Sequence, residues 1–111
     1  MKQGDIILVD FDPTKGREQE GYRPAVVISQ TAYNVKRNMV FVCPITKSTK
    51  SLRLRVLLDG RTQTQGDVLC EQVRTIDLLS RKCKVVDQLP KDLLKQVLEA
   101  VSVIIALENE R

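Results

Sequence analysis

The feature that most constrains the fold of this chain is a succession of short apolar runs, each closed within a few residues by turn-forming residues. Residues 25–28 are continuously apolar and mostly β-branched, which is typical of a strand buried on both faces. Other apolar runs are followed by turn-forming residues. These are the aspartate, proline and glycine within residues 12–16, and Asp59-Gly60. Only near the carboxyl end do apolar residues recur at steps of three and four, the spacing of an amphipathic helix. The pattern predicts a mainly β (α+β) fold that ends in one helix.

The expected elements can be placed by residue ranges. Strands are expected over residues 6–11, 24–29, 39–45, 52–58, 67–72, 74–79 and 83–86, and a short helical turn within residues 31–38. Pro90 is expected as the first helical residue, before an apolar stripe made of Leu94, Val97, Leu98, Val101, Ile104 and Ile105. Short strands at this spacing predict a small closed or nearly closed β-barrel. A C-terminal α-helix would cover one side of it, in a single domain over residues 1–111.

Composition excludes several classes of protein. No apolar stretch approaches the roughly 20 residues of a membrane-spanning helix, and the first residues lack the apolar core of a secretory signal. We therefore expect a cytoplasmic protein with no membrane partner. The 18 basic residues outnumber the 14 acidic ones, which gives a net charge of +4. That charge favours an anionic partner such as nucleic acid or an acidic peptide.

The chain contains no histidine and three cysteines without a close pair, Cys43, Cys70 and Cys83. Without histidine or a Cys-x-x-Cys pair there is no credible zinc site, and neither a Ser-His-Asp triad nor a two-histidine ribonuclease mechanism is possible. We expect no metal, no cofactor and no disulfide framework. Cys43 and Cys70 lie in apolar runs and are expected to pack as small hydrophobic side chains.

Two neighbouring segments near the start carry a specific pattern. Residues 4–16 hold a Gly-Asp pair, an apolar run and an Asp-Pro pair, and residues 18–27 hold Glu-Gln followed by Arg-Pro-Ala-Val-Val. This pattern resembles the opening of the MazF and PemK toxins, with weaker echoes at residues 44–46, 66–69 and 71–77. The resemblance implies an SH3-like barrel that forms a homodimer and binds single-stranded RNA in a groove at the dimer interface. It also implies a cognate antitoxin whose disordered tail occupies that groove, and binding to operator DNA only jointly with the antitoxin.

The resemblance also implies the roles of particular residues. Glu18 and Arg23 match the family's acid–base pair, and Thr46 matches a threonine near the scissile phosphate, so these three are the candidate catalytic residues. Leu69 stands where the PemK branch has an arginine, which favours the MazF-like arrangement. The candidate RNA-binding residues are Lys15, Gln19, Tyr22, Lys47, Glu71 and Gln72.

These groups suit RNA cleavage without a metal, in which the 2′-hydroxyl attacks the neighbouring phosphate. Glu18 can take the proton, best with a pKa raised toward neutrality. The guanidinium of Arg23 matches phosphate oxygens and can stabilise the transition state; whether it also serves as the acid is open, because its pKa exceeds about 12. Thr46 can donate a hydrogen bond to a phosphate oxygen. The expected products are a 2′,3′-cyclic phosphate and a 5′-hydroxyl.

Several alternatives stay open at this stage. Glu71 either contacts RNA or holds a backbone amide, and Gln72 either reads a base edge or bonds to backbone. Tyr22 and Tyr33 either stack on bases or pack. The basic residues Lys47, Lys50, Arg53 and Arg55 either follow RNA phosphates or form a solvated face. Two other functions also remain: a non-catalytic nucleic-acid-binding member of the family, and a CcdB-like gyrase poison, although this chain lacks that family's tryptophan-containing tail.

Overall fold

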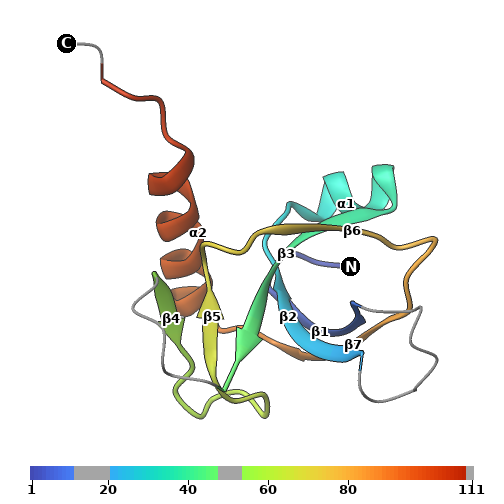
Figure 1. Cartoon of the computed structure of the whole chain (residues 1–111). Helices are drawn as coiled ribbons and strands as arrows, with labels where there is room; N and C mark the ends of the chain where they lie inside the picture. Colours follow the sequence, from blue (N-terminus) through green and yellow to red (C-terminus); the bar gives the residue numbers. More distant parts are fainter. Residues whose placement is uncertain (12–20, 48–53, 110–111) are drawn as a thin grey trace.

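Seven strands and two helices make up the part of the chain that the computed structural model describes, residues 1–11, 21–47 and 54–109 (Figure 1). In chain order they are β1 (Asp5–Asp10), β2 (Tyr22–Val27), α1 (Thr31–Arg37), β3 (Met39–Thr46), β4 (Arg55–Leu57), β5 (Asp67–Leu69), β6 (Arg74–Asp77), β7 (Cys83–Gln88) and α2 (Lys91–Ile105). The mainly β fold with a C-terminal helix is thus confirmed.

The strands form one antiparallel sheet around β3. Its order is β4-β5-β3-β2-β1-β7. One edge of β3 pairs with β2, and the other edge serves two strands, because β6 pairs with residues 39–42 and β5 pairs with Ile45 and Thr46. The long β3 therefore joins a larger group of strands to the short pair β4 and β5.

Among the described residues the sheet does not close, because β4 and β7 end the order without pairing with each other. The closed form of the expected barrel is therefore wrong, and the structure is an open, curved sheet. The strand β4 at one end of the order has only three residues and so offers few backbone groups for further pairing. Helix α2 packs against β4 instead (Figure 1).

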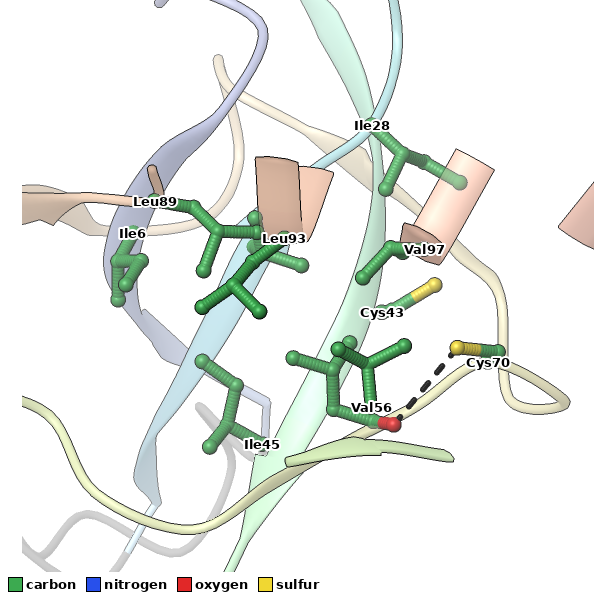
Figure 2. Packing of buried hydrophobic residues seen from close by; sticks show 11 residues of the cluster. Ile6, Ile28, Cys43, Ile45, Val56, Cys70, Leu89, Leu93 and Val97 are labelled. Atoms are coloured by element: carbon green, nitrogen blue, oxygen red, sulfur yellow. Dashed lines mark hydrogen bonds between the residues drawn. The ribbon is translucent and has the colours of Figure 1, made fainter. Parts of the chain in front are cut away.

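The second half of β2 is buried on both faces, which explains the continuous apolar run of residues 25–28. Val26 belongs to a cluster beneath α2, whereas Ala25 and Val27 belong to a cluster on the opposite face. Successive strand residues point to opposite faces, so a run with no polar alternation fits a strand covered on both sides. Figure 2 shows Leu93 and Val97 of α2 pointing toward the sheet in the first cluster.

The buried thiols follow the same rule. Cys43 and Cys70 are both fully buried in the cluster beneath α2, which confirms that they pack as small hydrophobic side chains (Figure 2). Both are free thiols.

Some boundaries differ from the expected ones. Pro90 is the N-cap of α2 rather than its first helical residue: its ψ is 145°, and its carbonyl accepts a hydrogen bond from Leu94 N at 2.9 Å. Strand β5 ends at Leu69, because the next residues turn and Gln72 N donates to Leu69 O at 3.2 Å. The end of the α2 stripe does not belong to the core: Leu94, Val97, Leu98 and Val101 pack in the cluster beneath the helix, whereas Ile104 and Ile105 are 50% and 75% exposed. No helix among the described residues is long and apolar enough to cross a membrane.

Candidate active site

A groove of about 780 Å³ opens where β2 begins and β3 ends. Four of the predicted site residues line it: Tyr22 and Arg23 from β2, Thr46 from the end of β3, and Lys47 directly after it. Arg23 and Lys47 are exposed, and Tyr22 and Thr46 are partly exposed. The groove therefore presents two cations, a hydroxyl and an aromatic ring to the same space.

The sheet register explains why Arg23 and Thr46 line the same groove although 22 residues lie between them in the sequence. Ala25 pairs with Pro44, and Val27 pairs with Val42. Continuing this antiparallel register toward the start of β2 places Arg23 opposite Thr46, and directly opposed residues have Cβ atoms about 5 Å apart. The register therefore directs the start of β2 and the end of β3 toward the same groove, which both side chains line.

Gly66 holds the other side of Thr46. Its φ is +125°, and a Cβ atom built there would lie 2.8 Å from the carbonyl carbon of Thr46 and still closer to the carbonyl oxygen. Only glycine combines this dihedral with such a close approach. The next residue, Asp67, pairs with Thr46 in the ladder between β3 and β5. Gly66 and Asp67 thus hold the backbone of Thr46 on the β5 side of β3.

Behind this ladder, Arg55 of β4 forms an ion pair with Asp67 at 3.3 Å. The Asp67 carboxylate is buried and the Arg55 side chain is 27% exposed. Arg55 does not line the groove, and its side chain is partly buried against Asp67 instead of lying on a solvated basic face. A contact between Arg55 and RNA phosphates stays a prediction. Its charge neutralises a buried carboxylate next to Thr46, and breaking such a pair leaves an unpaired buried charge.

Two of the predicted RNA-binding residues lie away from the groove. Glu71 follows the far end of β5, and its carboxylate accepts a hydrogen bond from Leu54 N at 2.8 Å. This confirms the backbone-holding alternative for Glu71. Gln72 sits in the same turn, with its backbone N–H bonded to Leu69 O. A role in RNA binding for either residue stays a prediction.

The remaining predicted residues fall elsewhere. Glu18, Lys15 and Gln19 lie outside the described residues, as do Lys50 and Arg53. Tyr33 of α1 packs edge-on against Phe41, with ring centroids 5.5 Å apart, so the packing alternative is confirmed for Tyr33. In the described ranges, no group of three or more histidine, cysteine, aspartate or glutamate side chains could hold a metal ion.

Two arginines that the sequence did not single out contact the residues just before the segment that carries Glu18. Phe11 N donates to Gly21 O at 3.0 Å, directly beside residues 12–20. Arg81 donates to the carbonyls of Asp10 and Phe11 at 3.1 and 2.7 Å. Arg74 lies over the Phe11 ring, 4.5 Å from its centroid. These contacts fix where the segment leaves β1 and re-enters the sheet next to Tyr22.

The groove has a further wall that sequence reasoning missed. Gln63, Thr64 and Gln65, from the loop between β4 and β5, line it together with Arg23 and Thr46. In the sequence these residues are an unremarkable polar stretch between two glycines. No local signal marks them, because their place in the groove depends on the pairing of β5 with β3.

Comparison with known proteins identifies the family. A family model described as PemK-like, MazF-like toxin of type II toxin–antitoxin systems matches residues 2–105. The chain belongs to this toxin family. It is 37% identical over 109 residues to the endoribonuclease PemK of Escherichia coli, an alignment that covers 95% of this chain and 82% of that protein.

Solved structures agree with the sequence match. A MazF crystal structure from Deinococcus radiodurans is similar with a TM-score of 0.83 and 30% identity, covering 96% of this chain and 97% of the other. A MazE–MazF crystal structure from the same organism is similar with a TM-score of 0.82 and 26% identity, covering 97% of each chain. The resemblance read from residues 4–27 is therefore confirmed.

Proposed function

We propose that this chain is a toxin endoribonuclease that binds single-stranded RNA in the groove and cuts it with Arg23 and Thr46 at the scissile phosphate. The endoribonuclease activity follows from membership in the toxin family and from its endoribonuclease relatives. The observation that carries the assignment of the site is the single groove that gathers Arg23, Thr46, Lys47 and Tyr22.

In the proposed reaction the 2′-hydroxyl attacks the adjacent phosphorus and loses its proton to Glu18, which comes from the segment between β1 and β2. Arg23 and the Thr46 hydroxyl donate hydrogen bonds to the phosphate oxygens as negative charge develops on them. The bond from phosphorus to the 5′-oxygen then breaks, and that oxygen takes up a proton. The products are a 2′,3′-cyclic phosphate and a 5′-hydroxyl, and no step in this scheme requires a metal ion.

The partners follow from the family. A type II system pairs the toxin with an antitoxin, and a related chain from Deinococcus radiodurans crystallised as MazE–MazF. We expect a cognate antitoxin, a homodimer of this chain, and operator DNA binding only together with the antitoxin. The substrate is messenger RNA. The chain forms a single toxin domain and acts in the cytoplasm.

The experiment that tests the proposal is a digest of a long single-stranded RNA in excess EDTA, with product ends mapped. Wild type should cut at a short repeated sequence and leave cyclic phosphate and 5′-hydroxyl ends. Removing one transition-state donor costs about 100-fold or more in rate, and removing a general base costs about 100-fold to 10,000-fold, so Glu18→Ala, Arg23→Ala and Arg23→Lys should all lose at least a factor of about 100. Arg23→Lys keeps the charge but not the two-pronged hydrogen bonding.

The controls separate this proposal from its rivals. Lys36→Ala, on the exposed surface of α1, should cut like wild type. A well-folded wild type that binds RNA but leaves it intact would support the non-catalytic alternative, and gyrase inhibition with intact RNA would support the CcdB-like one. Cutting at the parental rate by Glu18→Ala or Arg23→Ala would remove that residue from the mechanism.

A further inference from the structure

The loop between β4 and β5 differs in chemistry from the rest of the groove. Arg23 and Lys47 offer positive charge, whereas residues 62–65 are alternating threonine and glutamine without any charge. Cationic side chains suit phosphates, and uncharged amides suit base edges, which carry both donors and acceptors. The groove therefore has a phosphate-binding side and a side fit to recognise bases.

In this loop the guanidinium of Arg61 is hydrogen-bonded to two carboxylates. It donates to both oxygens of Asp59, at 3.0 and 2.7 Å, and to both oxygens of Asp92, at 2.9 and 2.8 Å. The hydrogen bonds from Arg61 lower the pKa of both carboxyl groups. Asp92 lies in the first turn of α2, so its hydrogen bonds with Arg61 connect the loop to the helix.

Three further hydrogen bonds fix the loop at and beside the groove. Gln63 N donates to a carboxylate oxygen of Asp87 in β7 at 2.6 Å. The buried Thr62 hydroxyl donates to Thr64 O at 2.6 Å. Leu58 N donates to Gly66 O at 3.0 Å and closes the loop at its base.

The side-chain amides of Gln63 and Gln65 are not used in this scaffold. Both residues are exposed, and neither side chain makes a hydrogen bond to the described part of the chain. A fixed backbone that presents free amides loses little entropy when a ligand binds. Each amide offers one acceptor and two donors to that ligand.

We infer that the loop of residues 58–66 is a base-reading element: Gln63 and Gln65 recognise the edge of a nucleobase next to the phosphate held by Arg23 and Thr46, and Arg61 positions them. The inference rests on the proposed function, because it concerns the same groove and an RNA ligand. Single-stranded RNA suits this recognition, since its unstacked bases expose their hydrogen-bonding edges.

The test is cleavage of an RNA pool with randomised sequence, followed by sequencing of the cut ends. The variants are Gln63→Ala, Gln65→Ala, the double variant and Arg61→Ala, with Gln96→Ala on the exposed face of α2 as the matched control. Losing a base-specific hydrogen-bonded pair should reduce discrimination at one position beside the cut about tenfold or more. Arg61→Ala should relax the preference at the same position, and Gln96→Ala should keep the wild-type profile.

The outcomes are distinguishable. A double variant that cuts more slowly but with the wild-type preference at every position would show contacts to the RNA backbone and overturn the base-reading role. A wild-type profile and wild-type rate in the double variant would overturn it as well. If wild type cuts no RNA at all, the proposed function fails first and the inference falls with it. Melting temperatures of all variants confirm that each one is folded.

Discussion

Residue identity alone did not decide the role of the strand arginines. Arg23 and Arg55 are both cations in or beside β-branched runs, yet Arg23 is exposed in the groove and Arg55 is ion-paired with the buried Asp67. Glu71 likewise bonds to the backbone of Leu54 instead of facing the groove. At the residue scale, the role of a charged side chain depends on which partner the fold brings within hydrogen-bond distance of it.

A prediction at the residue scale concerns Cys43. Burial raises the pKa of its thiol to about 12, with Cys70 adding to the effect, from an ordinary value near 9.0. Between these two values the folded state keeps the proton while the unfolded state loses it, so stability falls as the pH rises through that window. The slope from this one group is at most about 1.4 kcal/mol per pH unit, and it vanishes below pH 9.

The measurement is the free energy of unfolding in urea at pH 8 and pH 10.5. Cys43→Ala should lose less stability between the two than wild type does. Val68→Ala, a buried change in the same cluster that removes no titrating group, should lose as much as wild type. Parallel losses in wild type and Cys43→Ala would contradict the prediction.

At the scale of elements, periodicity located most strands and both helices but not where each one ends. The helical stripe of α2 was expected as one surface, yet it packs in the core only as far as Val101, and Figure 1 shows the helix extending beyond the sheet. The turn after Leu69 ends β5 early. Ends of elements depend on what a neighbouring element covers, which local periodicity does not contain.

A prediction at this scale concerns the two glycines of the base-reading loop, residues 58–66. Gly66→Ala should destabilise the fold by about 3 kcal/mol or more, because it combines a positive φ with a collision against the Thr46 backbone. Cleavage should fall further than the loss of folded protein explains, since Thr46 is displaced.

Gly60→Ala is the matched control. Its φ is +90°, but nothing lies within 4 Å of the position that a Cβ would occupy. It should cost only about 1 kcal/mol and leave cleavage unchanged. Unfolding free energies and cleavage rates of the two variants decide the point; equal costs for both would show that the close approach to Thr46 is unimportant.

At the scale of the whole molecule, the net charge of +4 is consistent with a nucleic-acid ligand. In the structure, however, only some of the basic residues lie in the groove, where they can contact that ligand. Among the described residues, Lys47 and Arg23 are the cations that line the groove, while Arg55, Arg61 and Arg81 form ion pairs or hydrogen bonds with other residues of the chain. Net charge alone would count all of these arginines toward RNA binding.

This contrast predicts the salt dependence of binding. RNA carrying 2′-O-methyl groups cannot supply the nucleophile and reports binding alone. Each phosphate contact to a single strand contributes about 0.7 to the slope of log K against log salt, so Lys47→Ala should reduce the slope by about that amount and weaken binding equally for all sequences. Lys36→Ala, on α1, should keep the wild-type slope, and an unchanged slope in Lys47→Ala would place that lysine outside the phosphate contacts.

The sequence by itself determined the fold class, the C-terminal helix, the burial of Cys43 and Cys70, and the family motif that holds Arg23. These follow from patterns within a few neighbouring residues, where strand alternation, helical spacing and turn chemistry operate. The tertiary structure decided that the sheet stays open, that Arg55 neutralises Asp67, and that residues 63–65 form a wall of the groove. Each of these depends on strand pairing between segments about 10 to 40 residues apart, and a one-residue change of register would place different side chains together.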